Sequence, residues 1–313
     1  MKILIIAFII LLTDTKSNFP INSDRVKKIK NEGHWKPSEV STNKFKGWSI
    51  SHIKSILGVT KDSYRNDEND IVRSFESRKK KCPFNISIPD EFDGRLNRTN
   101  CTGPVIDQGD CGSCWAFGAV ETLSDLFCLA KNYSTYLQLS TQDPVSCDRS
   151  NDGCYGGYLS SVFKYLTNKG VVTESCFPYK SGEAGRVPRC PTKCVNRTEK
   201  FTKYKCKKNS VVNLGGNSTC IQSWIYANGP MELGFYVYED FMNYHSGVYY
   251  YIDGELLGGH AIKVIGWGID KETGYKYWIC QNSWGSDWGM NGYFLIKEGE
   301  CSIESEAYSC IPN

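Results

Sequence analysis

The chain has few histidines, no repeat and, after its first twelve residues, no long apolar run. No segment beyond Leu12 is long and apolar enough to cross a bilayer, which argues against an integral membrane protein. The larger part of the chain, after residue 87, shows no internal repeat and no low-complexity tract. Only four histidines are present, and two of them, His245 and His260, follow residue 87. Any imidazole chemistry in that larger part of the chain therefore has two candidates.

The start of the chain is its one strongly apolar segment. Lys2 precedes an uninterrupted apolar run over residues 3–12, which is too short to span a bilayer and is typical of a secretory signal peptide. We expect residues 1–17 to be removed after Ser17 and the product to reach a lysosome-like vacuole or the cell exterior. Six Asn-X-Ser/Thr sites agree with that route; they are Asn85, Asn97, Asn100, Asn132, Asn196 and Asn217.

Charge divides the remaining chain into a basic leader, residues 18–87, and an acidic body, residues 88–313. Residues 1–87 hold 17 Lys or Arg against 9 Asp or Glu, a net +8, whereas the body holds 20 against 25, a net −5. We therefore expect the leader to dock on the body as an inhibitory pro-segment, and to be cut near residues 79–83. Its block 78–81 favours a solvated linker over nucleic-acid binding. Its apolar anchors are Trp35, Phe45, Trp48, Ile53, Ile56 and Leu57.

The stretch from Gln108 to Gly118 begins with turn-forming glycines and ends in a helical pattern. Apolar residues recur there at steps of three and four, through positions 116, 119, 120, 123, 126 and 127. Ser113 is placed to cap this helix, so Cys114 becomes its first residue. Unpaired N–H groups and the helix dipole favour a thiolate at that point, and we expect the pKa of Cys114 to fall. The pattern predicts a nucleophilic thiol.

Other readings of Cys111 and Cys114 are half of a zinc site, a redox dithiol, or ordinary disulfide bonds. A dithiol oxidoreductase needs a strand just before the motif, and a glycine-rich loop stands there instead. A non-catalytic binding protein on the same scaffold would be expected to lack the nucleophile or the histidine, and both are present. We therefore favour a thiol hydrolase that uses no metal and no cofactor.

The residues that such a hydrolase needs occur in order along the chain. His245 lies in a turn-like aromatic context and is expected at the surface, which leaves His260 as the base. Asn282 can accept a ring N–H and orient that imidazole, and Trp284 can shield the bond from water. Gln108 can aim its amide N–H beside the backbone N–H of Cys114 to stabilise an oxyanion. These residues in this order along the chain indicate a thiol hydrolase far more specifically than any one of them does.

The fold expected for the body is α+β in two parts. Its 226 residues suffice for two sub-domains that share an extended core. Helical patterns occupy the first part, including a second helix over residues 158–168. The second part changes to β-branched and aromatic runs bounded by Gly, Asp or Asn, at 237–238, 246–252, 260–267, 275–280 and 292–297. We expect antiparallel, barrel-like strands there and a cleft between the halves.

Four segments together resemble the papain family of cysteine peptidases, in particular its cathepsin B branch: residues 108–118, 154–158, 258–261 and 282–285. The resemblance covers nearly the whole body and also residues 35–58 of the leader. It implies that Cys114 is the nucleophile, His260 the general acid and base, Asn282 the orienting residue and Gln108 the oxyanion donor. The leader would then lie backwards along the cleft and block it. Substrates would be proteins and peptides, the enzyme a monomer, with no nucleic-acid or membrane partner.

The same resemblance assigns the residues that line the cleft. Gly156, Gly157 and Gly259 match positions on the non-primed side, where bare backbone can bind an extended peptide as a strand would. Ala261 and Trp284 complete the predicted substrate-binding set. Glu306 matches an acidic residue at the floor of the second specificity pocket, which implies acceptance of Arg there beside large apolar side chains.

Disulfide pairing is also carried over from the family. The resemblance implies the pairs Cys101–Cys128, Cys111–Cys154, Cys147–Cys190 and Cys176–Cys194. Local pairs Cys206–Cys220 and Cys301–Cys310 are expected among the remaining cysteines, which would leave Cys280 as a buried thiol. Sequence alone does not settle connectivity.

The chain departs from the cathepsin B pattern at one place. The long insertion that closes the primed end of the cleft in cathepsin B, and that carries two histidines, matches a short span here, from Cys176 to Cys190, without histidine. We therefore expect an open cleft, cleavage within chains, and weak or absent release of C-terminal dipeptides. Arg186 and Arg189 in this span are the alternative groups for binding a carboxylate.

Overall fold

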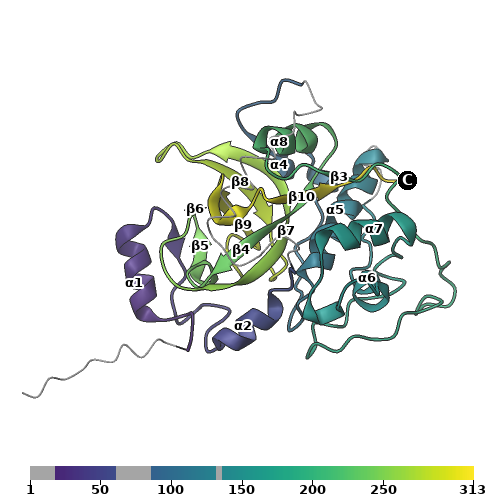
Figure 1. Ribbon diagram of the computed structural model, residues 1–313, viewed down its shortest axis with the longest axis horizontal. Helices are drawn as coiled ribbons and strands as arrows, with labels where there is room; N and C mark the ends of the chain where they lie inside the picture. Colours follow the sequence, from purple (N-terminus) through teal and green to yellow (C-terminus); the bar gives the residue numbers. More distant parts are fainter. Residues whose placement is uncertain (1–17, 61–85, 132–135) are drawn as a thin grey trace, which may run out of the picture.

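The computed structural model describes residues 18–60, 86–131 and 136–313. The predicted signal peptide (1–17), the predicted cleavage region (79–83), Cys82 and the sequons at Asn85 and Asn132 lie outside these residues. The body has the two halves that were expected: α5 (Cys114–Ala130), α6 (Gln142–Cys147) and α7 (Leu159–Asn168) form one, and the sheet forms the other (Figure 1). Two further helices, α4 (Gly94–Asn97) and α8 (Ser218–Ala227), lie on the sheet half. Within the described ranges, no helix is long and apolar enough to cross a membrane.

The helices are α1 (Ser23–Glu32), α2 (Ile50–Ile56), α4 (Gly94–Asn97), α5 (Cys114–Ala130), α6 (Gln142–Cys147), α7 (Leu159–Asn168) and α8 (Ser218–Ala227). Short 3-10 turns are η1 (Thr99–Cys101), η2 (Gly153–Tyr155), η3 (Phe241–Asn243) and η4 (Glu300–Ser302). The strands are β1 (Lys36–Pro37), β2 (Phe92–Asp93), β3 (Val212–Asn213), β4 (Met231–Tyr238), β5 (Tyr244–Ser246), β6 (Val248–Tyr249), β7 (Leu256–Ile269), β8 (Lys276–Gln281), β9 (Tyr293–Lys297) and β10 (Glu306–Ser309).

The main sheet runs in the order β3-β10-β4-β7-β8-β9-β6, with β2 added beside β7. All of its pairs are antiparallel except β6 with β9, which are parallel. The sheet path is open at β3 and β6, so within the described residues it curves without closing into a barrel. The long strand β7 is central: it pairs with β4 on one side and β8 on the other, and it carries His260.

Helix α5 joins the two halves. Every residue from Cys114 to Cys128 is buried, because one side of the helix packs on α6 and α7 and the other on β4 and β7. An apolar pattern that wraps most of the helix is what such two-sided packing requires. The first half of β7, which carries His260, and the helix start at Cys114 therefore meet where the halves join.

The leader docks on the sheet half, and α2 lies where the two halves meet (Figure 1). Strand β1 pairs with β5 of the body, and the Trp35 side chain is buried against Tyr244 and Tyr249. The anchors Phe45, Ile53 and Ile56 also join the core of the body. Charge complementarity adds to this apolar docking: Arg25 binds Glu239 and Asp253, and Lys28 binds Asp253. Docking of a basic leader on an acidic body is thus present in the structure.

The four disulfides that the resemblance implied are present: Cys101–Cys128, Cys111–Cys154, Cys147–Cys190 and Cys176–Cys194. The two local pairs were wrong. Cys206 bonds to Cys310 across 104 residues, Cys220 is disulfide-bonded but not to Cys206, and Cys301 remains a buried thiol, as does Cys280. The reason is topological: β10 lies between β3 and β4, and the chain end that follows it reaches Cys206, with which Pro312 forms a β-bridge.

Candidate active site

Cys114 is the first residue of α5, as predicted, but it is covered by the leader. Its sulfur accepts a hydrogen bond from the backbone N–H of Gly58 at 3.3 Å. Burial raises the pKa of the Cys114 thiol to about 12, and backbone N–H groups of Ala261, Gly58 and Trp115 offset only part of that rise. The expected fall in pKa is therefore wrong for this state of the protein, because the helix dipole is outweighed once the leader has removed water.

Ser113 occupies the N-cap position without capping the helix. Its side chain makes no capping hydrogen bond, and its Oγ instead lies 2.8 Å from the hydroxyl oxygen of Tyr179. The Tyr179 hydroxyl also donates to the backbone oxygen of Gln108 at 2.8 Å. Tyr179 thus ties the start of α5 to the loop that carries Gln108, a role that no sequence signal indicated.

His260 is fully buried and is held by Asn282. Its Nε2 lies 2.8 Å from Asn282 Oδ1, and the Trp284 ring packs with its centroid 4.7 Å from that of the imidazole. Burial lowers the pKa of His260 to about 4, although the Asn282 bond opposes the shift. A neutral ring that donates from Nε2 leaves Nδ1 as the acceptor, and Nδ1 has no hydrogen-bond partner among the described residues. The next residue, Ala261, packs directly against Cys114.

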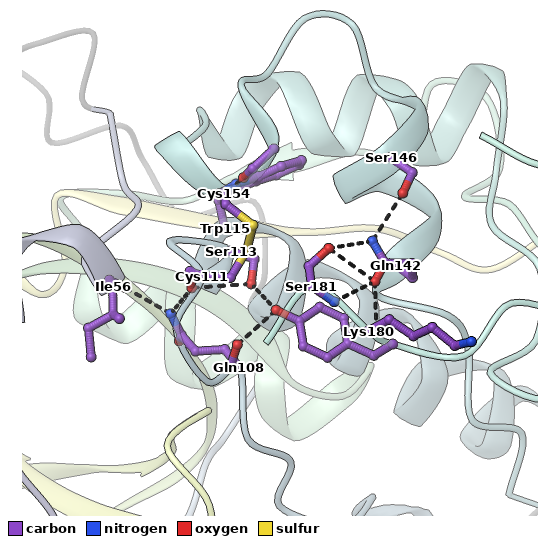
Figure 2. The surroundings of a disulfide bond; sticks show 12 residues. Ile56, Gln108, Cys111, Ser113, Trp115, Gln142, Ser146, Cys154, Lys180 and Ser181 are labelled. Atoms are coloured by element: carbon purple, nitrogen blue, oxygen red, sulfur yellow. Dashed lines mark hydrogen bonds between the residues drawn. A yellow bond between two sulfur atoms is a disulfide. The ribbon is translucent and has the colours of Figure 1, made fainter. Parts of the chain in front are cut away.

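Gln108 presents its amide at the same place. Its Nε2 donates to the backbone oxygen of Ile56 at 2.8 Å and to that of Cys111 at 2.7 Å (Figure 2). Its Oε1 accepts from the Ser283 hydroxyl at 2.6 Å, which fixes the amide with the nitrogen outward. A donor aimed in this way can stabilise an oxygen that gains negative charge. In this structure a leader carbonyl occupies it.

The glycines predicted to bind substrate backbone bind the leader. Val59 N–H donates to the Gly259 oxygen at 3.0 Å, Gly157 N–H donates to the Gly58 oxygen at 2.9 Å, and Thr60 N–H donates to the Gly157 oxygen at 2.9 Å. Residues 58–60 are therefore bonded on both sides, as an added strand would be. Gly156 has a φ of +121°, and a Cβ there would approach Thr60 and Gly58.

Glu306 lies half-buried on β10, opposite Gly234 of β4. Its charge and, more strongly, burial raise the pKa of the neighbouring Glu232 well above its usual range. Glu232 is fully buried beside Gly118, where a Cβ would come within 2.7 Å of its Oε1. The predicted acidic position is thus accompanied by a second carboxyl that sequence reasoning missed.

The alternatives for the cysteine pair do not fit this geometry. Cys111 is bonded to Cys154, so it cannot form a redox dithiol or a zinc site with Cys114. Among the described residues, the cluster with the residue types and spacing of metal ligands is Cys176, Cys194 and Glu199. Its two sulfurs form a disulfide, which removes them as thiolate ligands.

Comparisons with known proteins agree with the geometry. A family model described as papain family cysteine protease matches residues 88–311. The chain belongs to this family.

Curated relatives place the protease in the cathepsin B-like branch. It is 43% identical over 220 residues to cathepsin B-like CP3 of Giardia intestinalis, with 70% of this chain and 73% of the relative covered. It is 39% identical over 251 residues to a cathepsin B-like cysteine proteinase of Schistosoma japonicum, with 71% and 73% covered. Among solved structures, procathepsin B S9 from Trypanosoma congolense superposes with a TM-score of 0.80 at 28% identity, over 94% of this chain and 99% of that one. The protein is a cathepsin B-like cysteine protease.

The structural likeness includes the leader. The Trypanosoma congolense structure is a proform, and the coverage of 94% extends beyond the body of the protease. A ragweed pollen cysteine protease in its proform shares the fold, with a TM-score of 0.72. An inhibitory role for the leader of this protease is supported by that likeness and by its contacts with Cys114 and Gln108.

Proposed function

We propose that the protein is an endopeptidase made as a latent precursor, in which the leader holds the catalytic groups covered and neutral. The observation that carries the proposal is that one leader segment binds the proposed nucleophile, the proposed oxyanion donor and a predicted substrate-binding glycine at once. Ile56 binds Gln108, Gly58 binds Cys114, and Val59 binds Gly259. Groups that bind an inhibitory strand in this manner can bind a substrate strand in its place.

Loss of the leader reverses the cause of both pKa shifts. Burial raises the pKa of Cys114 and lowers that of His260. Return of water lowers the first and raises the second, so the proton passes from thiol to imidazole and the helix dipole then supports the thiolate. The Cys114–His260 pair titrates as one unit in the mature enzyme, and its rate is bell-shaped in pH.

The reaction proceeds through a thioester. The Cys114 thiolate attacks the peptide carbonyl carbon, and the resulting oxyanion is stabilised by Gln108 Nε2 and the backbone N–H of Cys114. Protonated His260 gives its proton to the amide nitrogen as the C–N bond breaks. Neutral His260 then takes a proton from water, whose hydroxyl attacks the thioester, and the acid product leaves with regeneration of the thiolate. Asn282 keeps the ring oriented in both steps.

Cleavage within chains follows from the short segment at residues 177–189. It holds no histidine, it lies within the loop that Cys176–Cys194 closes, and its far end is tied to Cys147 through Cys190. Without the histidine pair that grips a terminal carboxylate in cathepsin B, a long peptide can extend past Cys114 in both directions. Glu306 at the second specificity pocket adds tolerance of Arg. We further propose a monomer that follows the secretory route with removal of residues 1–17 and cleavage in 79–83.

Digestion of one long peptide tests this function. Mass mapping of early products from the mature protein should show internal cuts, all of them lost in Cys114→Ala. Stepwise loss of C-terminal dipeptides would overturn the endopeptidase assignment, and cleavage by Cys114→Ala would overturn the mechanism.

A further inference from the structure

The leader places a lysine between two carboxylates of the body, beside the catalytic groups. Lys44 Nζ lies 2.6 Å from Asp107 Oδ2 and 2.8 Å from Asp287 Oδ1. The Lys44 side chain is 19% exposed, whereas those of Asp107 and Asp287 are 46% and 67% exposed. The ammonium group is thus the more enclosed partner, and the body alone supplies both of its acceptors.

The position of this lysine along the cleft follows from the path of the leader. Going from Lys44 toward Thr60, the chain reaches the Cys114 sulfur at Gly58 and then pairs with Gly259 and Gly157. Lys44 therefore precedes Cys114, while the glycines follow it. Since the glycines bind the acyl side of a substrate in the proposed function, the two carboxylates lie on the side of the leaving amine.

The surrounding backbone is built to leave room for a cation. Asp107 directly precedes Gln108, forms a β-bridge with Trp284, and has its Oδ1 fixed by the N–H of Gly109 at 2.9 Å. Its Oδ2 is left for the ammonium. Gly285 has a φ of +73°, and a Cβ there would lie within 3.0 Å of Asp287 Oδ1, Asp107 Oδ2 and Lys44 Nζ. Any larger residue at 285 would be strained and would crowd the cation.

We propose that Asp107 and Asp287 form a subsite on the leaving-group side that selects a lysine or arginine side chain of the substrate, and that Lys44 occupies this subsite in the precursor. The inference rests on the proposed function and names a substrate class for it. When the leader departs, two carboxylates that shared one cation are left close together, and a substrate cation relieves their repulsion. A free C-terminal carboxylate would add to that repulsion, so the same pair disfavours removal of short C-terminal pieces.

Both basic side chains suit the subsite. Acceptors from two separate loops match an ammonium, which has three rotatable donors, and a guanidinium can bridge the same two groups through its fork. The carboxylates are partly exposed, so the binding free energy gained by a substrate cation is that of a solvent-screened ion pair. We expect a preference of about three- to tenfold in kcat/KM over a neutral side chain of the same length.

Paired quenched peptides test the subsite in the mature enzyme. All peptides share one parent sequence. One series carries a single lysine at the first, second or third position after the cleaved bond, and the other series carries norleucine at the same position. The readout is the ratio of kcat/KM for the two peptides, which divides out changes in catalytic power. For the wild-type enzyme, the lysine-to-norleucine ratio should exceed about three at one position. The ratio should fall toward one in Asp107→Asn/Asp287→Asn. It should stay at the wild-type value in the control Asp90→Asn/Glu272→Gln, which makes the same charge change at exposed sites.

Charge reversal provides a second test that does not depend on loss of function. Asp287→Lys should favour glutamate over norleucine at that same position, and added salt should shrink both preferences. A wild-type ratio near one at all three positions, or an equal ratio in the double Asn variant, would overturn the inference while leaving the endopeptidase intact. If the wild-type enzyme cleaved neither series, the proposed function would fall and the subsite with it.

Discussion

The backbone oxygen of Ile56 accepts a hydrogen bond from Gln108 Nε2 at 2.8 Å, so the inhibitory leader occupies the donor that is proposed to stabilise the oxyanion. In the proposed mechanism, one amide group therefore serves both latency and catalysis. A residue that binds both a leader carbonyl and a developing oxyanion should affect activation and turnover together when it is changed.

Gln108→Ala should lower kcat of the mature enzyme by about 10²–10³-fold with little change in KM, because the lost bond belongs to the transition state. Steady-state rates on one peptide measure this. Gln138→Ala is the control, since the Gln138 amide takes part in no hydrogen bond of the described residues, and it should match wild type. If Gln108→Ala raised KM and left kcat unchanged, Gln108 would not be part of the oxyanion site.

Arg25→Met should speed conversion of the precursor to the mature form. Arg25 binds Glu239 at 2.8 Å and Asp253 at 3.0 Å from a nearly buried position, and its loss leaves Glu239 buried without that partner. The rate of appearance of mature protein on a gel measures the effect. Lys27→Met removes an exposed charge from the same helix and should convert at the wild-type rate; equal rates for the two variants would show that these ion pairs do not retain the leader.

The precursor should lose stability as pH rises from about 5 to 8.5. Burial raises the pKa of Glu121 to about 8, with Lys263 opposing the shift. A carboxyl whose folded pKa lies above its unfolded value of about 4.3 binds its proton more tightly in the folded state. Its contribution is therefore present below that unfolded value and is lost as pH rises through the folded pKa.

Thermal unfolding in a Cys114→Ala background, which prevents self-digestion, measures this dependence. Glu121→Gln should flatten the fall of Tm with pH, because the amide cannot ionise, whereas Glu272→Gln at an exposed site should not. If Tm of Glu121→Gln fell with pH as steeply as that of the wild type, the pH dependence could not be assigned to Glu121.

Lys263→Met should destabilise the protein by about 3–5 kcal/mol, since it leaves a buried carboxylate without its ammonium partner. Lys263 Nζ lies 2.7 Å from Asp125 Oδ2, both side chains are essentially inaccessible, and the pair joins β7 to α5. Replacing both members, as Lys263→Met/Asp125→Leu, should recover much of the loss. Denaturant unfolding of the four proteins in the cycle measures the coupling, and strictly additive losses would contradict it.

The sequence predicted the parts of the site that are tied to local motifs. The helix start at Cys114 and a strand through His260 follow from short patterns of turn residues and periodicity, whereas the roles of the glycines at 156, 157 and 259 came from the resemblance to the papain family. Those patterns reflect local backbone preferences, so they can be read without tertiary information.

The remainder depends on contacts between distant residues. Cys206–Cys310 closes 104 residues and follows from the position of β10, which no local pattern fixes. The pKa of Cys114 was predicted with the wrong sign because the helix dipole is visible in the sequence while burial by Gly58 is not. Tyr179 and the pairing of Lys44 with Asp107 likewise arise only when separate loops meet.

The most direct measurement compares the alkylation rate of Cys114 in the precursor and in the mature enzyme between pH 5 and 9, with mass mapping to identify the modified residue. We predict that mature Cys114 reacts fast across this range, and far faster than Cys280 or Cys301, while Cys114 of the precursor, whose pKa burial raises to about 12, stays nearly unreactive. Equal rates for the two forms, or modification of the mature enzyme at another cysteine, would contradict the account that the leader keeps a nucleophilic thiolate neutral.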